Sequence, residues 1–245
     1  MTTTPPRGPR DAPGPDPGAE VGAAGRHADV RAQLSGLAGR EVRWPVGRWP
    51  DTGVLRPAAV LVLFGVLDHV PASHAHRVVP GDLDVLLVGR SPDLAHHAGQ
   101  VAFPGGRVDP TDASPEAAAL REAVEETGLD PAGVELLGSL AQVPVPVSHH
   151  LVTPVLGWWH ERSAVGVVDH RESAHVFGAP VADLVDPARR RTVAVRVDGG
   201  RHRTPAFLVG DHVVWGFTAM ILDTVLDALG WAEPWDRGAE IPMPR

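Results

Sequence analysis

The chain has 245 residues, of which 43% are hydrophobic and 21% are charged, and its formal net charge is −8. This length allows one or two domains, and the apolar fraction is sufficient for one sizeable core. The absence of cysteine excludes disulfide bonds, thiolate metal sites and a cysteine nucleophile. The balance of 22 basic against 30 acidic residues argues against a nucleic-acid-binding protein.

The N-terminal sequence lacks the apolar core of a signal peptide. The longest apolar stretches, such as residues 57–67, have about half the length that a membrane span requires. We therefore expect a cytoplasmic protein that has no membrane partner.

Three segments are expected along the chain. Residues 1–28 are rich in proline and glycine and show no apolar periodicity, which predicts a disordered tail. Residues 29–230 are expected to form the domain, with a helical extension at its start, and residues 231–245 a C-terminal tail. In chain order, the domain is predicted to contain strands at 58–68 and 84–90, a helix at 115–127, strands at 134–143, 151–159, 175–180, 192–197 and 205–209, and a helix at 215–229. Several strands around two principal helices favour an α+β fold or an α/β/α sandwich.

The helix at 115–127 has clear signals at both ends. Ser114 suits the N-cap, Pro115 the first helical position, and Gly128 the left-handed residue that follows the helix. The residues expected to face the core are Ala117, Leu120, Ala123 and Val124.

Three carboxylates, Glu122, Glu125 and Glu126, are expected on the opposite arc of this helix. Carboxylates at these spacings repel, each pair costing roughly 0.2–0.5 kcal/mol, and the only adjacent cation is Arg121. Converging carboxylates are what a hard divalent cation binds. The preceding glycine pair at 105–106 lets the main chain approach a ligand closely. The alternative is a solvated acidic face without a ligand.

The segment REAVEETGL (121–129) resembles the end of the Nudix box, the signature of hydrolases that act on nucleoside diphosphates linked to another moiety. Upstream, LLVGRSPDLAHHAGQVAFPGGRVDPTDAS (86–114) resembles the extended motif of the coenzyme A pyrophosphatase branch. Downstream, TPAF (204–207) and VWGFTAMIL (214–222) resemble the family's C-terminal segment. This resemblance implies a Nudix fold, which is an α/β/α sandwich with a mixed β-sheet.

The resemblance also implies hydrolysis of the pyrophosphate bond of coenzyme A, or of a derivative, with Mg²⁺ or Mn²⁺. The products would be 4′-phosphopantetheine and 3′,5′-ADP. The implied metal ligands are Glu122, Glu125, Glu126 and the carbonyl of Gly106.

The implied catalytic residues are Glu122, Arg121 and Glu125, where Glu122 either binds metal or accepts the proton of the attacking water and Arg121 orients a neighbouring carboxylate. The implied substrate-binding residues are Arg90, His97, Phe103, Gly105 and Gly106. Nudix proteins are often dimers, so a homodimer is a further expectation.

The sequence departs from the family pattern at two positions. Ala113 stands where most Nudix boxes have a glutamate, with Asp109, Asp112 and Glu116 nearby. Ala95 stands where the coenzyme A branch often has a basic residue, which weakens the expected recognition of the 3′-phosphate.

Three alternatives to the coenzyme A assignment follow. The chain could act as a Nudix pyrophosphatase on ADP-ribose, a dinucleotide or a nucleoside triphosphate, as a nucleotide-sensing module without catalysis, or as a structural domain. In addition, Glu172 occupies the place of a loop glutamate that serves some Nudix enzymes as a base or as an extra metal ligand.

Other polar groups are interpreted as structural or solvated. The segment His74–His76 and the pair His149–His150 suggest zinc, but adjacent residues of a strand point to opposite faces, so such a pair seldom supplies two ligands. The run Arg189–Arg191 is predicted to be a solvated loop.

Overall fold

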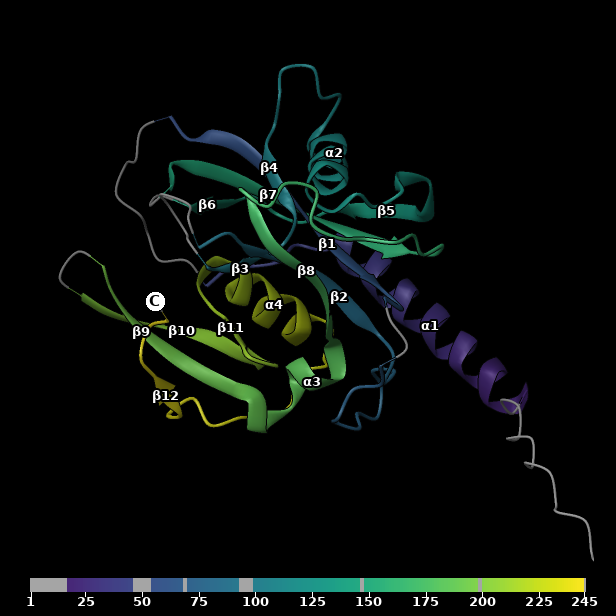
Figure 1. Ribbon diagram of the computed structural model, residues 1–245. Helices are drawn as coiled ribbons and strands as arrows, with labels where there is room; N and C mark the ends of the chain where they lie inside the picture. Colours follow the sequence, from purple (N-terminus) through teal and green to yellow (C-terminus); the bar gives the residue numbers. More distant parts are fainter. Residues whose placement is uncertain are drawn as a thin grey trace, which may run out of the picture.

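A computed structural model of the chain describes residues 17–45, 54–67, 70–92, 99–145, 148–197 and 200–244. Figure 1 shows a large β-sheet with helices on both faces and a smaller sheet beside it. No helix in these ranges is long and apolar enough to cross a membrane.

The larger sheet contains strands from most of the domain. Its strands are β1 (Arg56–Gly65), β2 (Asp84–Arg90), β3 (Val101–Ala102), β4 (Gly105–Arg107), β5 (Val134–Ser139), β6 (Val143–Val145), β7 (His150–Trp159) and β8 (Ser173–Pro180). The central order is β3-β2-β1-β7-β5, while β8 pairs with β2, β4 with β1 and β6 with β7. β1 and β7 are parallel and the other pairs are antiparallel, so the predicted mixed sheet is confirmed.

A second sheet, which the sequence did not predict as a separate unit, is formed by the C-terminal strands. They are β9 (Arg190–Val197), β10 (Gly200–Val209), β11 (His212–Val214) and β12 (Glu240–Ile241), in the order β11-β10-β9-β12. Figure 1 shows this sheet at the lower left, next to α4.

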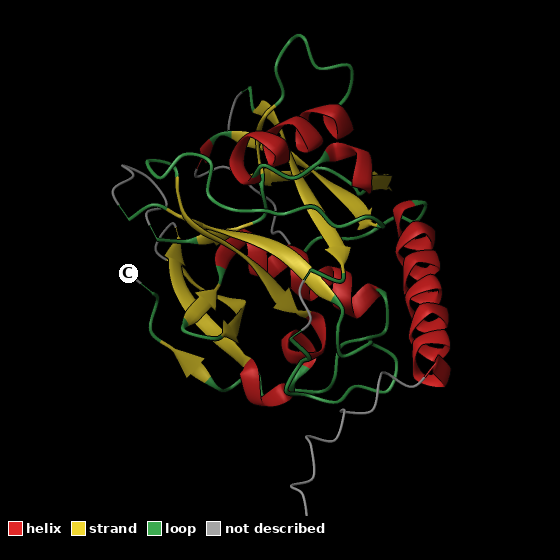
Figure 2. Ribbon diagram, turned by 45° about the vertical axis from the view of Figure 1, so that its right-hand side comes forward, coloured by secondary structure: helices red, strands yellow, loops and turns green. Residues whose placement is uncertain are grey.

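The helices divide between the two faces of the larger sheet. They are α1 (Pro17–Ala38), α2 (Pro115–Thr127), α3 (Val181–Val185) and α4 (Gly216–Ala228), with 3₁₀ turns at Pro131–Gly133 and Pro187–Arg189. α2 lies at the top of Figure 2, and α1 runs along the right-hand edge. The α+β class is therefore confirmed.

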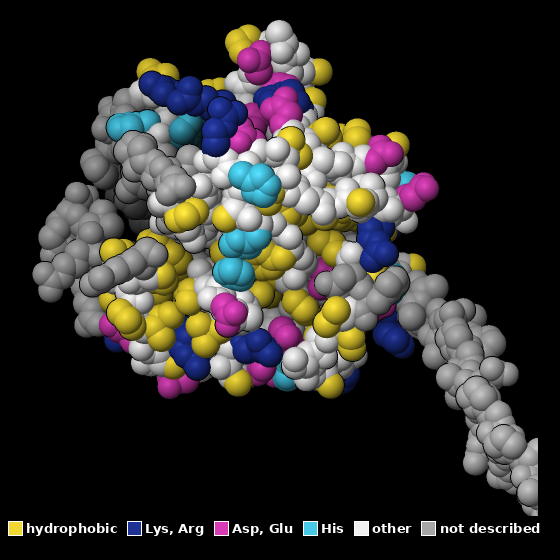
Figure 3. All heavy atoms as spheres, viewed as in Figure 1, with side chains coloured by type: hydrophobic (Ala, Val, Ile, Leu, Met, Phe, Trp, Pro, Cys, Tyr) yellow, Lys and Arg dark blue, Asp and Glu magenta, His cyan; other side chains and the backbone are white. Residues whose placement is uncertain are grey.

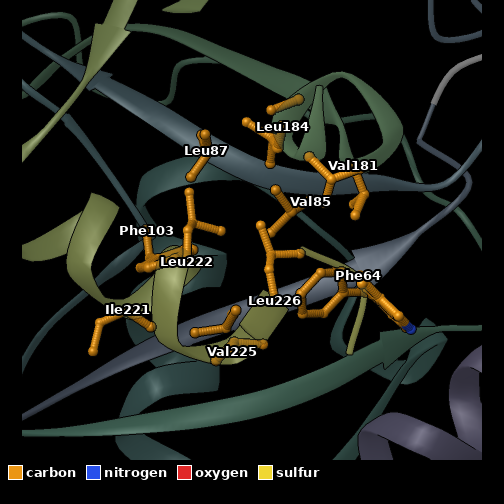
Figure 4. Close-up of a cluster of buried hydrophobic side chains, with 14 of the residues drawn as sticks. Phe64, Val85, Leu87, Phe103, Val181, Leu184, Ile221, Leu222, Val225 and Leu226 are labelled. Atoms are coloured by element: carbon orange, nitrogen blue, oxygen red, sulfur yellow. The ribbon is translucent and has the colours of Figure 1, made fainter. Parts of the chain in front are cut away.

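β1 shows why both faces are covered. Successive side chains of a strand alternate between faces, so Leu61 and Leu63 pack in the cluster that α2 contacts, whereas Val62 and Phe64 pack in the cluster that contains α1 and α4. Figure 4 shows this second cluster, where Phe64 lies close to Leu226 of α4. A strand buried on both faces reads as a continuous apolar run, which is why β1 was predictable from sequence.

The described residues of both expected tails contain regular structure. Helix α1 begins at Pro17, so residues 17–28 are helical, and the earlier part of the expected tail lies outside the described residues. Proline is tolerated in the first turn of a helix, and the alanines that follow have high helix propensity. At the other end, Trp231 is 1% exposed and β12 pairs with β9, so residues 231–245 are partly packed on the domain.

The predicted solvated arginine loop is wrong at its central residue. Arg190 begins β9 and is fully buried. Its guanidinium binds Asp223 of α4 and lies 4.3 Å from the Phe207 ring centroid and 4.6 Å from that of Trp235. These partners are distant in sequence, so a run of three arginines gave no sign of them.

Candidate active site

Helix α2 is fixed at both ends by the predicted capping residues. The Ser114 hydroxyl accepts a hydrogen bond from the Ala117 N–H at 3.3 Å, and Pro115 takes the first turn. Gly128 has φ 70°, and its N–H donates to the Val124 carbonyl at 2.8 Å. These contacts fix which side chains α2 turns toward the sheet.

The buried face of α2 is rotated from the predicted one. The residues of α2 that are buried are Ala118, Ala119, Ala123 and Thr127. Ala117, which was expected in the core, is only half-buried. As a result, Glu122 and Glu126 lie half-buried at the margin of the helix–sheet contact, and only Glu125 is exposed.

The glycine pair brings the main chain of β4 against both half-buried carboxylates. The Gly105 N–H donates to Glu126 Oε2 at 3.0 Å. A Cβ on Gly106 would lie 2.5 Å from Glu122 Oε2, so the carboxylate occupies the space that any side chain would need. Gly105 has φ 154°, and a Cβ there would lie 2.4 Å from the Ala59 carbonyl oxygen. Position 105 therefore requires glycine, whereas a side chain at position 106 would displace the Glu122 carboxylate.

Arg121 contacts three carboxylates around it. Its Nη1 donates to Glu122 Oε1 and to Glu125 Oε2, each at 3.0 Å, and its Nη2 donates to the Arg107 carbonyl at 3.1 Å. Its Nε and Nη2 bind the two oxygens of Asp112, each at 3.0 Å. This contact is the main cause that raises the pKa of Arg121 and lowers that of Asp112.

Asp112 is thus a site residue to which sequence reasoning assigned no role. Its side chain is 6% exposed, and its two oxygens accept hydrogen bonds from two nitrogens of the Arg121 guanidinium. Such bidentate pairing is strong and geometrically specific. The available signal was an aspartate beside Ala113, where a glutamate is usual.

The environment of Glu126 is crowded with negative charge. Burial raises the pKa of Glu126 to about 7, opposed by the Gly105 N–H and by Arg90, while Glu122 and Glu172 raise it further. Burial also raises the pKa of Glu122, against the effect of its Arg121 contact. Two neighbouring carboxylates that are both disfavoured as anions form a site that a cation would stabilise.

The donor set fits a hard divalent cation in its chemistry. It offers the carboxylate oxygens of α2, which lie against the main chain of the glycine pair, and oxygen atoms are the ligands that Mg²⁺ and Mn²⁺ prefer. Within the described ranges, no group of three or more His, Asp or Glu side chains already converges on one point. Glu122 and Glu125 turn toward Arg121 instead, so binding a metal would require them to exchange that contact.

The three remaining predicted residues, Arg90, Phe103 and His97, differ in their surroundings. Arg90 ends β2, acts electrostatically on Glu126, and has a buried Nε with no hydrogen-bond partner among the described residues. Phe103 is 3% exposed and packs in the α4 cluster, near Leu222 in Figure 4, so it lies in the core. His97 lies outside the described residues.

Glu172 lies within electrostatic reach of Glu126. It is exposed, its N–H donates to the Asp169 carbonyl at 3.0 Å, and its own carbonyl accepts from the Ser91 N–H at 2.9 Å. The structure therefore brings together α2, the glycine pair, Arg90 and the segment that carries Glu172.

Comparison with known proteins gives one family. The NUDIX domain matches residues 69–195. The uncharacterized Nudix hydrolase NudL of Escherichia coli is 42% identical over 146 residues, which cover 60% of this chain and 73% of NudL. NudL of Shigella boydii matches with the same identity and coverage. Among solved structures, a MutT/nudix family protein from Enterococcus faecalis aligns with a TM-score of 0.41 and 19% identity, covering 89% of this chain and 81% of that one.

Proposed function

Because this chain belongs to the NUDIX domain family and is a pyrophosphatase of the Nudix hydrolase type, we propose that its substrate is coenzyme A or a derivative of it. Water would attack one phosphorus of the diphosphate, the bridging P–O bond would break, and 4′-phosphopantetheine and 3′,5′-ADP would leave. The observation that carries this proposal is that two parts of the motif at 86–114 lie near the carboxylates of α2. The charge of Arg90 acts on Glu126, and the main chain of the glycine pair lies against Glu126 and Glu122.

Nudix hydrolases generally use divalent metal ions, and we propose Mg²⁺ or Mn²⁺ here. Glu126, Glu125 and the Gly106 carbonyl would hold the ion, and Glu122 would join them unless it serves as the base. When bound, it supplies positive charge to the diphosphate and lowers the pKa of water. This assignment is supported by the unbalanced negative charge around Glu126.

The chain's own residues would then divide the remaining work. Glu122 lies beside the Gly106 main chain and would accept the proton of the attacking water. Arg121 holds Glu122 through Nη1, which sets the direction of that carboxylate. Arg90 would face the anionic diphosphate from the sheet, because its charge acts on Glu126 and its Nε has no partner among the described residues.

Hydrolysis of ADP-ribose, a dinucleotide or a nucleoside triphosphate is the second candidate. It is favoured by Ala95, which replaces the basic residue that often occurs in the coenzyme A branch. A nucleotide-sensing module without catalysis is disfavoured, because Arg121, Glu122, Glu125 and Glu126 are all present.

Mass spectrometry of coenzyme A incubated with the purified protein and Mg²⁺ or Mn²⁺ tests the proposal. We expect 4′-phosphopantetheine and 3′,5′-ADP with the wild type and neither product with Glu126→Gln. The amide keeps the shape of the side chain and removes a charge that burial disfavours, so this variant is expected to fold. Glu161→Gln is the matched control, since it removes an exposed carboxylate outside α2.

The outcomes separate the candidates. If coenzyme A survives while ADP-ribose or another diphosphate is cleaved, the coenzyme A proposal fails and the second candidate replaces it. If Glu126→Gln retains full turnover, the assignment of α2 as the catalytic helix fails. A cytoplasmic location and a homodimer also stay proposals, the latter to be tested by sedimentation velocity.

A further inference from the structure

Four basic side chains gather where β1 and β7 begin. Arg56 is the register partner of His150 in the parallel β1–β7 pair, and Ala58, two residues further along β1, is the partner of Arg107 on β4. Residues two apart on a strand share a face, so Arg56, Arg107 and His150 project from the same face of the sheet. His149 adjoins them, and we call these four residues the basic patch.

The backbone of the basic patch is held in an unusual conformation. His149 has φ 54°, which non-glycine residues seldom adopt. Its carbonyl accepts a hydrogen bond from the Arg56 N–H at 2.9 Å. The turn into β7 is therefore tied to the start of β1, which keeps the basic residues of both strands together.

Among the described residues, no carboxylate pairs with the two arginines of the basic patch. Arg56 and Arg107 are exposed, and neither has a side-chain hydrogen bond or ion pair with any described residue. Other arginines of the described ranges do have carboxylate partners, and these are Arg31, Arg121, Arg171, Arg189, Arg190 and Arg203. Burial lowers the pKa of His150, and Arg107, Arg56 and His149 lower it further, as expected beside uncompensated positive charge.

The basic patch adjoins the proposed reaction centre. Arg107 directly follows Gly106, whose main chain lies against Glu122. The Arg107 carbonyl accepts from Arg121, so the same residue contacts the catalytic helix through its backbone and carries a free guanidinium. In Figure 3 the upper left of the molecule, where β1 begins, shows dark-blue and cyan side chains beside the magenta carboxylates at the top.

We propose that Arg56, Arg107 and His150 bind a phosphate monoester that the substrate carries in addition to the diphosphate that is cleaved. The inference rests on the proposed function, which places a diphosphate at Gly106 and α2. β4 pairs only with β1 among the described strands, so an extended ligand can pass over its free edge from the α2 face to the basic patch. Two guanidinium groups with no carboxylate partner match the charge of a phosphate monoester dianion. A polyanion is disfavoured, because only four basic groups are present in a chain of net charge −8.

Kinetics on coenzyme A and on 3′-dephospho-coenzyme A test this assignment, because the two differ only in a phosphate monoester. The wild type is expected to favour coenzyme A in kcat/KM by about tenfold or more, the order of one charge-assisted hydrogen bond. In the Arg56→Gln/Arg107→Gln protein this ratio is expected to fall toward one. Arg40→Gln/Arg43→Gln removes the same charge from the segment that follows α1 and is expected to retain the wild-type ratio.

Calorimetric titration with 3′,5′-ADP and with 5′-AMP supplies a readout that needs no turnover. We expect tighter binding of 3′,5′-ADP by the wild type and equal binding of the two nucleotides by the Arg56→Gln/Arg107→Gln protein. If neither coenzyme is hydrolysed, the proposed function fails, and this titration still decides the inference.

Two results would overturn the inference. One is a folded Arg56→Gln/Arg107→Gln protein that keeps the wild-type discrimination in both assays. The other is inorganic phosphate that binds as tightly as 3′,5′-ADP and loses its binding in the same variant, since the basic patch would then be a site for free phosphate and not for a group of the substrate.

Discussion

Replacement of Gly106 by alanine would separate the proposed catalytic role of the glycine pair from its structural role. The added methyl would lie 2.5 Å from Glu122 Oε2 and 2.6 Å from its carboxyl carbon, whereas such contacts normally need about 3.5 Å. Glu122 would therefore have to move by roughly 1 Å, and misplacement on that scale can cost about 10²-fold in rate. Gly106 does not have a positive φ, so the backbone itself would not be strained.

The cost in stability is expected to be small. Moving Glu122 weakens its contact with Arg121, and a partly exposed pair of this kind contributes about 0–1 kcal/mol. A loss of that size lowers the Tm by about 2–4 °C at most for a domain of this length. The assay is kcat/KM on the substrate that the wild type cleaves, measured beside thermal unfolding.

Gly105→Ala is the contrasting variant. A methyl there would meet main-chain atoms, 2.4 Å from the Ala59 carbonyl oxygen and 2.6 Å from Val60 Cα, at a φ of 154°. Backbone strain and overpacking of about 1–3 kcal/mol each predict a fall in Tm of roughly 10 °C. A Gly106→Ala protein that turns over at the wild-type rate would refute the placement of Glu122 against this glycine.

Three further substitutions test the fold around the site. Arg190→Ala leaves Asp223 without its buried partner, so urea unfolding should show a free energy of unfolding that is lower by about 3–5 kcal/mol. Adding Asp223→Ala should lower it little further, and additive losses would contradict this coupling. Burial, and to a lesser extent the charge of His212, lowers the pKa of His175 below its unfolded value of about 6.5. The native protein therefore binds fewer protons, and this contribution to stability is complete above about pH 6.5 and declines as the pH falls through the folded pKa; His175→Phe should flatten the profile measured between about pH 5 and 7. Ser114→Ala removes the N-cap of α2 and should cost about 1 kcal/mol, seen as a Tm lower by about 2–4 °C, and an unchanged Tm would mean that the cap is not needed.

The parts of the fold that sequence predicted correctly depend on local signals. α2 was predicted with its observed bounds, because Ser114, Pro115 and Gly128 act within one turn of the helix ends. β2 was likewise predicted with its observed bounds, because a short apolar run between turn residues identifies a buried strand. The grouping of three carboxylates on α2 was also predicted from local spacing, and their role as metal ligands stays a prediction.

The parts that were missed depend on partners distant in sequence. Arg190 was interpreted as solvated, because its partner Asp223 is 33 residues away. Asp112 had no assigned role, because the loop between β4 and α2 decides whether it faces Arg121. The separate second sheet could not be predicted either, because β12 reaches β9 only after α4 has intervened.

Partial burial of Glu122 and Glu126 distinguishes this helix from a solvated acidic face. A helix without a ligand would gain stability by exposing all three carboxylates, as it does Glu125. Burial instead raises the pKa of both residues, and Arg121 compensates for Glu122 alone by a direct contact. Glu126 accepts one hydrogen bond, from the Gly105 N–H, and has like charges nearby. A divalent cation stabilises such an arrangement. This imbalance of charge, more than the number of acidic residues, supports the proposed role of α2 in the hydrolysis of an anionic diphosphate.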